Sequence, residues 1–458
     1  MDQTISTLLI LGASGDLSSR LLLPALGQLL TKQPGYDVHL VGSGIEDLGP
    51  DAWKTLVSTA FASTDSQGPA VDSLLAGTHY QQADVTKADD LTTLLGLCTG
   101  APAIYFALPP AVTAKVCDAL SEIDLPEGTQ LAMEKPFGTD ERGARELNAR
   151  IARLVPENQV HRVDHFLGHS TVFNILGLRF ANQIFEPVWD SNHIEKVDIV
   201  FDEQLGLEGR ARYYDHAGAL VDMLQSHLLQ VLSIVAMEPP ATLEAGDLRD
   251  AKGMVLRATH VYDDDPAAHS RRARYTAGSI ADRHFVSYVD EPGVDPANHT
   301  ETLAEVTVGI ENWRWAGVPF TLRSGKALGE RRREVVITFK PAAHIPTGLT
   351  GAKEPTVLRI FIGPDKMSLE LNINGPGDPY TIERVSLDAT FEAGQYRAYG
   401  EVLGGILAGD PSLSVRGDTA EQCWRIVQPV LDAWRADEVP LDEYAAGSEG
   451  PANWNRVG

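Results

Sequence analysis

The sequence predicts an α/β domain built on a parallel sheet, followed by an α+β domain. In the first part of the chain, short apolar runs alternate with helical patterns, which is typical of a doubly wound sheet. After about Asp164 strand and helix patterns no longer alternate, which indicates a second domain of the α+β class. The length of 458 residues favours two or three domains at roughly 150 residues each, and we expect two, at 1–165 and 166–458.

The elements of the first domain follow one another in strand-and-helix order. Strands are expected at the short apolar runs 6–12, 38–42, 103–108, 131–134 and 160–163. Helical patterns are expected at 16–32, 51–62, 88–98 and 140–154. Pro24 predicts an irregularity in the first helix, because proline lacks the N–H that a helix interior uses.

The elements of the second domain are long helical patterns and β-like stretches. A helical pattern begins at Ser170, another covers 217–237, and a terminal helix is expected at 418–436. Strands are expected at 196–201, 306–310, 334–339, 356–362 and 368–373.

The charge of the chain excludes two classes of partner. Its 38 Lys and Arg residues against 63 Asp and Glu residues give a formal charge of −25. Such a chain is not expected to bind nucleic acid, whose phosphates require a basic face, or an anionic membrane surface. A small anionic ligand stays open, because a local cluster of Lys, Arg and His can override the global field.

The cysteines and apolar runs indicate a cytoplasmic protein. Cys98, Cys117 and Cys423 lie far apart and form neither a CxxC motif nor a disulfide framework. The amino-terminal stretch has no basic region, and its apolar run is too short for a signal peptide. We expect no apolar stretch long enough to cross a bilayer.

A glycine-containing loop follows the first predicted strand and opens a helix. It reads GASGDLS from Gly12 to Ser18, a G-x-x-G-x-x-S pattern. Small residues let the backbone approach a pyrophosphate, and a helix N-terminus offers free N–H groups. We therefore predict dinucleotide binding by Gly12, Ser14, Gly15, Asp16 and Leu17. The alternative is an ordinary strand-to-helix turn.

Sequence blocks along nearly the whole chain carry a family resemblance. They include GASGDLSSRLLLPAL, IYFALPP, EKPFG, RVDHFLGH, DMLQSHLLQVL and NWRWAGVPFTLRSGKAL. In this order the blocks resemble the glucose-6-phosphate dehydrogenase family. The resemblance implies an α/β Rossmann-like dinucleotide-binding domain followed by an α+β domain with a large, mostly antiparallel sheet. It also implies a homodimer or homotetramer that serves glucose metabolism in the pentose phosphate pathway.

The resemblance implies an oxidoreductase that oxidises C1 of a hexose 6-phosphate, glucose 6-phosphate first, to the 1,5-lactone. His227 in QSHLLQ matches the family's catalytic base, and Asp164 in RVDH matches the carboxylate that pairs with it. Histidine suits a base that works near neutral pH, and a carboxylate on its far nitrogen stabilises the imidazolium. The alternative for His227 is a structural histidine on a buried helix face.

Three more residues match groups that contact the sugar. Lys135 in EKP matches a lysine that reaches both sugar and cofactor, and it lies at a strand end, where doubly wound sheets bind ligands. Glu203 and Asp222 match acidic residues that bind sugar hydroxyls, a natural task for carboxylate acceptors. Without the resemblance, both would be read as solvated surface charges.

The phosphate-binding block departs from the family pattern R-x-D-H-Y-L-G-K. His165 is kept, but Phe166 replaces the tyrosine and His169 replaces the lysine. His165, His169, Lys326 and Arg331 are the expected phosphate ligands. Losing one charge-assisted hydrogen bond costs about 1.5–3 kcal/mol, or roughly 10- to 100-fold in affinity.

Three further departures leave the substrate open. Val221 stands where the family usually has arginine, Ser226 replaces asparagine, and 358–365 lacks the family's sugar-contacting glutamine. One alternative is a dehydrogenase of an unphosphorylated or otherwise C6-substituted hexose. Another is a catalytically silent dinucleotide-binding relative, against which the retained His227 and Lys135 count.

The end of the second predicted strand bears on the cofactor. Ile45 stands where NADP-using relatives carry an arginine, and Glu46 would repel a 2′-phosphate or accept ribose hydroxyls. Arg20 remains as a phosphate contact. With Ser43, Glu46, Arg20 and Lys135 as further cofactor-binding residues, we expect NAD to be used at least as readily as NADP.

A metal site and a second dinucleotide site are not expected. His161, His165 and His169 recur every four residues, which on one helix would form a metal-binding face. The strand predicted at 160–163 interrupts such a helix. No basic cluster in the carboxy-terminal half clearly marks a second, structural dinucleotide site.

Overall fold

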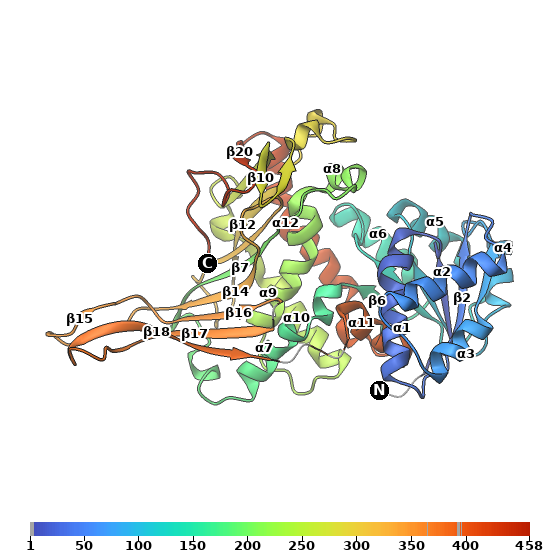
Figure 1. Cartoon of the computed structure of the whole chain (residues 1–458), viewed down its shortest axis with the longest axis horizontal. Helices are drawn as coiled ribbons and strands as arrows, with labels where there is room; N and C mark the ends of the chain where they lie inside the picture. The colour runs from blue at the N-terminus through green and yellow to red at the C-terminus, as the bar shows by residue number, and fades with distance from the viewer. Residues whose placement is uncertain (1–3, 364, 392–393, 395) are drawn as a thin grey trace. The chain divides into compact units, whose positions relative to one another are not determined.

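The computed structural model describes residues 4–363, 365–391, 394 and 396–458 (Figure 1). Residues 1–3 of the amino-terminal stretch and Pro364 of the 358–365 segment lie outside the described residues. Contacts divide the chain into two compact units. One holds Met1–His169, Pro240–Ala251 and Gly394–Gln422, and the other holds Ser170–Pro239, Lys252–Ala393 and Cys423–Gly458. The domain boundary at 165/166 stays a prediction.

The first unit is built on a seven-stranded sheet. Its strands β1 to β6 run parallel in the order β6-β5-β4-β1-β2-β3, and β19 joins β6 antiparallel. The order reverses between β1 and β4, and such sheets bind ligands at the carboxyl ends of the strands beside that point. The strands are β1 (Thr7–Leu11), β2 (His39–Gly44), β3 (His79–Gln82), β4 (Pro102–Phe106), β5 (Gln130–Glu134), β6 (Val160–Val163) and β19 (Ser414–Val415).

Helices connect and cover these strands. They are α1 (Leu23–Lys32), α2 (Pro50–Ala62), α3 (Pro69–Gly77), α4 (Ala88–Leu95), α5 (Pro110–Leu120), α6 (Glu141–Ile151) and α11 (Ala398–Ala408). The strands and helices predicted for this part are confirmed, with ends that differ by a few residues. The sequence did not indicate β3, β19, α3, α5 or α11. The strand β3 was not predicted because its sequence, HYQQ, is mostly polar, which suits a strand at the edge of a sheet.

The first helix is irregular, as Pro24 predicts. A π-helical turn at Ser18–Leu22 precedes α1, and Pro24 lies in the first turn of α1. Proline is tolerated there because the first N–H groups of a helix have no intrahelical acceptor. The run 16–32 is therefore two joined helical segments rather than one regular helix.

Among the described residues, the second unit is built on an eleven-stranded sheet in which most neighbours are antiparallel, whereas β7–β13, β15–β18 and β9–β20 are paired parallel. The large, mostly antiparallel sheet is confirmed. The strands are β7 (Ile194–Asp202), β8 (Thr259–Val261), β9 (Ser270–Thr276), β12 (Leu303–Ile310), β13 (Phe320–Gly325), β14 (Arg332–Phe339), β15 (Thr350–Gly351), β16 (Val357–Phe361), β17 (Lys366–Asn374), β18 (Thr381–Thr390) and β20 (Leu441–Ala445). A separate hairpin pairs β10 (Gly278–Ile280) with β11 (Arg283–Phe285).

The second unit holds α7 (Ser170–Phe180), α8 (Ala211–Ala219) and α9 (Leu229–Ala236), whereas α10 (Ala245–Ala258) and α12 (Gly417–Arg435) begin in the first unit and continue into the second. The predicted helices from Ser170 and at 418–436 are confirmed. The one predicted at 217–237 is not a regular helix. Gly218 has φ +65° and ψ 177°, and a π-helix at Leu220–Leu228 separates α8 from α9.

The same run corrects the expectation about apolar length. Ala211–Ala236 spans 26 residues and is apolar enough, by length and composition, to cross a membrane. In the structure the most apolar part of this run is almost wholly buried inside the protein. The apolar run is therefore read as a core element.

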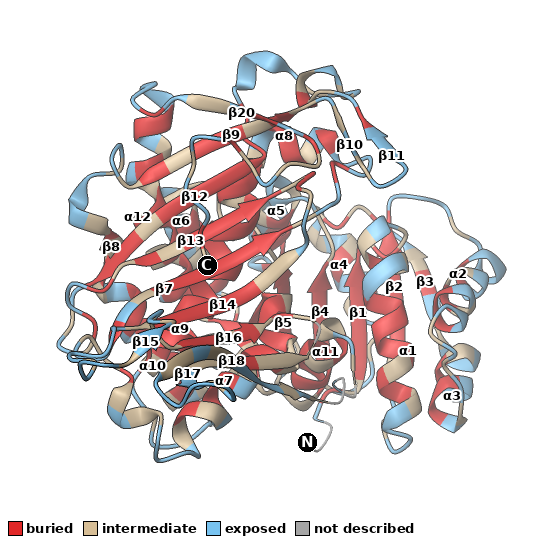
Figure 2. Cartoon of the chain, turned by 60° about the vertical axis from the view of Figure 1, so that its left-hand side comes forward, coloured by how far each residue is buried: buried red, intermediate tan, exposed pale blue. Residues whose placement is uncertain are grey.

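Figure 2 shows the centre of the large sheet, including β7, β13 and β14, as largely buried, whereas β17 and β18 carry exposed residues.

Candidate functional site

The predicted dinucleotide loop leaves the carboxyl end of β1 and reaches across to β2. The backbone N–H groups of Gly12 and Ala13 both donate to the carbonyl of Ser43, each at 2.8 Å. Gly12 has φ +84°, and a side chain there would collide with the carbonyl oxygen of Ala107. Glycine is thus required for the turn and for the close approach. The structure brings Gly12, Ser14 and Ser43 together at this edge, and the absence of a side chain at Gly12 suits a pyrophosphate.

The acidic residue at the end of β2 is held by this loop. The Ser14 hydroxyl donates to Oε2 of Glu46 at 2.6 Å. That hydrogen bond, with one from the Glu46 backbone, lowers the pKa of the Glu46 carboxyl. Ile45 beside it is 73% exposed. Arg20 pairs with Asp16 at 3.2 Å on the exposed face of the first helical turn. The hydrogen bond from Ser14 therefore holds the Glu46 carboxylate against the loop.

The next predicted residues, Lys135 and Asp164, directly follow the ends of two neighbouring parallel strands. Glu134 closes β5 and is followed by Lys135, whose bond to Pro136 is cis. Asp164 follows β6, and its Oδ1 accepts a hydrogen bond from the N–H of Phe166 at 3.0 Å. Asp164 thereby caps a short 3₁₀ turn at His165–Gly168. Because β5 and β6 are adjacent and parallel, Lys135 and Asp164 lie at the same edge of the sheet.

The phosphate-binding block forms a cluster of rings. The His165 ring stacks on Tyr399 of α11, with centroids 5.4 Å apart and planes at 12°. Phe166 and His169 pack edge to face at 5.5 Å, and the centroids of His165 and His169 are 6.3 Å apart. Phe166 is buried, whereas both histidines are partly exposed. The structure thus brings His165 and His169 together within the first unit.

The predicted base and one sugar ligand share the π-helix of the second unit. His227 and Asp222 are 1% and 6% exposed. Their spacing of five residues equals the hydrogen-bond spacing of a π-helix, and such segments occur frequently at functional sites. Tyr213 donates a hydrogen bond to Oδ1 of Asp222 at 3.4 Å. The Ser226 hydroxyl is buried and has no hydrogen-bond partner among the described residues.

Glu203 is held between two cations. Its Oε2 accepts from Nζ of Lys326 at 2.9 Å, and its Oε1 accepts from Arg333 at 2.8 Å. The Arg333 guanidinium also lies over the Phe201 ring at 4.2 Å. The predicted ligand Arg331 is exposed. Arg333 was not predicted from the sequence, because three consecutive arginines at 331–333 do not indicate which one faces inward. Only the register of β14 in the sheet determines which of these arginines faces Glu203.

His161 has a structural environment. It lies on β6, where Nε2 is 3.0 Å from Oε1 of Gln130 and Nδ1 is 3.4 Å from the Ser414 hydroxyl. Burial lowers the pKa of His161 to about 4, so the ring is neutral at physiological pH. Among the described residues, no group of three or more His, Cys, Asp or Glu side chains could hold a metal ion.

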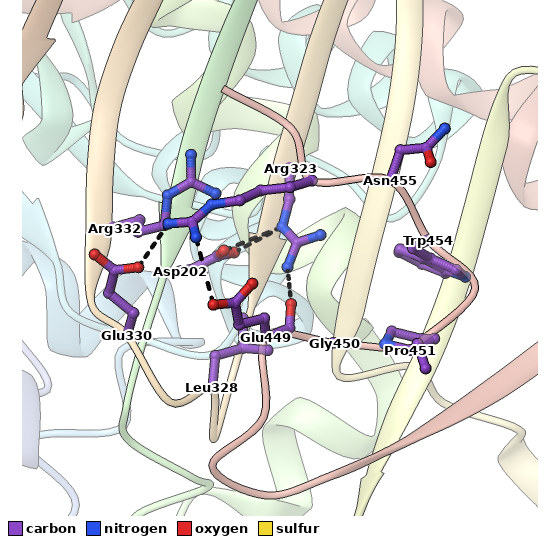
Figure 3. Close-up of a pocket in the computed structure, with 12 residues that line it drawn as sticks. Asp202, Arg323, Leu328, Glu330, Arg332, Glu449, Gly450, Pro451, Trp454 and Asn455 are labelled. Atoms are coloured by element: carbon purple, nitrogen blue, oxygen red, sulfur yellow. Dashed lines mark hydrogen bonds and ion pairs between the residues drawn. The ribbon is translucent and has the colours of Figure 1, made fainter.

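A pocket of about 170 Å³ lies in the second unit between the large sheet and the carboxy-terminal segment (Figure 3). Three arginines line it, which the sequence did not indicate. Arg323 donates a hydrogen bond to the carbonyl of Glu449 at 2.8 Å, and Arg332 donates one to the carbonyl of Val457 at 2.6 Å. Each guanidinium is paired with a carboxylate, at 2.8–3.0 Å: Arg323 with Asp202, Arg332 with Glu334, and Arg456 with Glu330.

Comparison with known families covers nearly the whole chain. Residues 9–174 match the model "Glucose-6-phosphate dehydrogenase, NAD binding domain". Residues 176–457 match "Glucose-6-phosphate dehydrogenase, C-terminal domain". The chain belongs to the glucose-6-phosphate dehydrogenase family. The resemblance read from the sequence blocks is confirmed, and so is a domain for a nicotinamide dinucleotide.

Members of this family match over nearly their full length. The glucose-6-phosphate 1-dehydrogenase of Gluconobacter oxydans is 38% identical, with 96% of this chain and 94% of the relative covered. The crystal structure of the enzyme from Mycobacterium avium has a TM-score of 0.86 at 34% identity, covering 98% of this chain and 96% of that one. A glucose-6-phosphate dehydrogenase solved in complex with glucose 6-phosphate has a TM-score of 0.87 at 28% identity, covering 99% and 97%. The fold class read from the sequence is confirmed.

Proposed function

We propose that this protein is a glucose-6-phosphate 1-dehydrogenase. It oxidises C1 of glucose 6-phosphate to the 1,5-lactone and passes the hydride to NAD or NADP. The observation that carries the proposal is full-length membership of a family whose relatives are named for this activity. The dinucleotide loop at Gly12 and the buried His227 on the π-helix support it.

His227 is the proposed base. It takes the proton from the C1 hydroxyl, and Asp164 fixes the tautomer and stabilises the imidazolium. A bound nicotinamide dinucleotide supplies the hydride acceptor. The burial of His227 supports this assignment, because a desolvated site strengthens each charge interaction made within it.

Glu203 and Asp222 are the proposed hydroxyl ligands. Both carboxylates lie in the second unit, and the ion pairs with Lys326 and Arg333 hold the Glu203 carboxylate in place. An ionised carboxylate accepts hydrogen bonds from two neighbouring hydroxyls. Lys135, at the end of β5, is assigned to both sugar and cofactor.

His165, His169, Lys326 and Arg331 are the proposed phosphate ligands. The stack of His165 on Tyr399 supports this assignment, because it fixes one ring of the cluster. An unphosphorylated hexose is the second candidate substrate. The observation that favours it is Phe166, which is buried and has no hydroxyl to offer a phosphate.

We propose that NAD is used at least as readily as NADP. The hydrogen bond from Ser14 keeps Glu46 ionised beside the place where an adenosine ribose meets the end of β2. A 2′-phosphate would face that carboxylate. No arginine stands at position 45 to offset it.

The test is a panel of glucose 6-phosphate, glucose and other hexoses with both cofactors, followed by the absorbance of reduced nicotinamide. We expect kcat/KM to be highest for glucose 6-phosphate. A higher value for glucose would replace the substrate proposal with the second candidate. No reduction with any hexose would favour the silent relative.

We further propose a cytoplasmic homodimer or homotetramer. The exposed apolar side chains Ile373 on β17 and Leu387 on β18, 49% and 58% accessible, support self-association. Light scattering on the purified protein measures the mass. A monomer at micromolar concentration would contradict this part of the proposal.

A further inference from the structure

Glu134 lies at the ligand-binding edge of the first unit, and the proposed mechanism gives its carboxylate no role. It is the last residue of β5 and directly precedes Lys135. Its Oε1 accepts a hydrogen bond from the hydroxyl of Tyr105 at 2.5 Å. The side chain of Tyr399 also forms a hydrogen bond with it. Glu134 therefore connects two tyrosines, one on β4 and one on α11.

The second tyrosine leads directly to the phosphate-binding cluster. The ring of Tyr399 lies flat against His165 at 5.4 Å. This contact depends on the close approach of α11 to the 3₁₀ turn that holds His165. Gly168 permits that approach, because a side chain there would collide with the carbonyl oxygen of Ala398. Moving Tyr399 therefore moves the surface on which His165 rests.

The charges around Glu134 explain what its carboxylate does. Lys135 and Asp164 act on it through space, and Tyr105 and Tyr399 donate to it. Ionised, the carboxylate accepts from both tyrosines and attracts the Lys135 ammonium. Protonated, it becomes a donor itself, and one tyrosine hydroxyl has to turn. Burial raises the pKa of Glu134 to about 7, which brings this change into the range of ordinary assays.

We propose that Glu134 is a positioning residue for substrate binding: through Tyr399 it holds His165 in place, and by its charge it orients Lys135. The inference rests on the proposed function, because His165 is assigned there to the phosphate and Lys135 to the sugar and the cofactor. Glu134 itself touches neither the reacting atoms nor the cofactor in this scheme.

The test compares wild type, Glu134→Gln, Tyr399→Phe and the double variant, with glucose 6-phosphate as the varied substrate at pH 8. Glu134→Gln keeps the shape and one acceptor but removes the charge. We expect each single variant to raise KM about tenfold, since each loses one charge-assisted hydrogen bond. We expect kcat to change less than twofold. The KM of the double variant should lie within about twofold of the higher of the two single-variant KM values, because both changes break the same connection.

Two measurements separate this role from general damage. The dissociation constant of the cofactor, measured by calorimetry, should be the same in Tyr399→Phe and in wild type, since that variant alters neither the Gly12 loop nor Lys135. Tyr380→Phe, at an exposed tyrosine of the second unit, is the matched control and should leave KM unchanged.

Three results would overturn the inference. One is a loss of kcat with unchanged KM, which would give Glu134 a chemical role. Another is a double variant whose KM is the product of the two single effects. The third is a wild type that reduces neither cofactor with any hexose, in which case the proposed function fails first. Tyr399→Phe alone decides the matter if Glu134→Gln does not fold.

Discussion

The hydroxyl of Ser14 donates a 2.6 Å hydrogen bond to the carboxylate of Glu46, which joins the dinucleotide loop to the end of β2. The two residues are 32 positions apart in the sequence. The contact fixes an anion where the adenosine ribose of a dinucleotide meets a doubly wound sheet. It also lowers the pKa of Glu46, so the charge persists through the neutral range.

The first prediction concerns cofactor choice. Glu46→Gln removes the charge while keeping the side-chain length. We expect KM for NADP to fall roughly tenfold, about 1.4 kcal/mol, and KM for NAD to change less. Initial rates with both cofactors at saturating glucose 6-phosphate measure this. Glu46→Asp, which keeps the charge, is the control, and an equal fall in that variant would refute the electrostatic explanation.

The second prediction concerns the cations on Glu203. Arg333→Met leaves Lys326 as the partner of that carboxylate and removes one charge-assisted hydrogen bond. We expect KM for the sugar to rise by about 10-fold or more, in line with a cost of about 1.5–3 kcal/mol. Arg435→Gln, in an exposed ion pair on α12, serves as control. Steady-state kinetics check this, and unchanged KM in Arg333→Met would contradict it.

The third prediction concerns the phosphate. His169→Lys restores the cation of the family pattern, and a lysine stays charged where a histidine becomes neutral. We expect KM for glucose 6-phosphate to fall about tenfold at pH 8, with little change for glucose. The same assay on both sugars measures the difference. If the two KM values fall together, the residue does not read the phosphate.

The fourth prediction concerns the packing of α11. Gly168→Ala places a methyl group against the carbonyl of Ala398, and overpacking of this kind costs about 1–3 kcal/mol. Gly177→Ala, in α7 with open space around it, should instead stabilise the protein by about 0.4–1 kcal/mol. Thermal denaturation compares the two. A Gly168→Ala variant as stable as wild type would show that α11 moves without cost.

The fifth prediction concerns pH. Burial raises the pKa of Glu301 to about 7, although its Oε1 accepts from the N–H of Leu220 at 2.9 Å. Because the folded state holds this proton more tightly than the unfolded state does, stability falls as pH rises from about 4.5 through 7. We expect Glu301→Gln to be more stable than wild type by about 1–3 kcal/mol at pH 8.5, and not at pH 4.5. Denaturation midpoints at the two pH values check this. A larger gain at pH 4.5 would reverse the sign and refute it.

The sequence by itself determined the alternation that makes the first unit a doubly wound sheet, because apolar runs and turn residues are local signals. It also determined the family, because Gly12, Lys135 and His227 lie in contiguous blocks that can be compared without coordinates. It identified Gly168 as part of such a block, but not why a side chain there is excluded.

Only the tertiary structure decided which side chains meet. The pairs Ser14–Glu46, Glu203–Arg333 and His165–Tyr399 join residues 32, 130 and 234 positions apart along the numbering. No period or motif relates such positions, because strand order and register set these contacts. The π-helix at Leu220–Leu228 is likewise a product of packing, since its apolar letters fit an ordinary α-helix equally well. Local pattern therefore determines which elements form, and burial in a common core determines which of their residues work together.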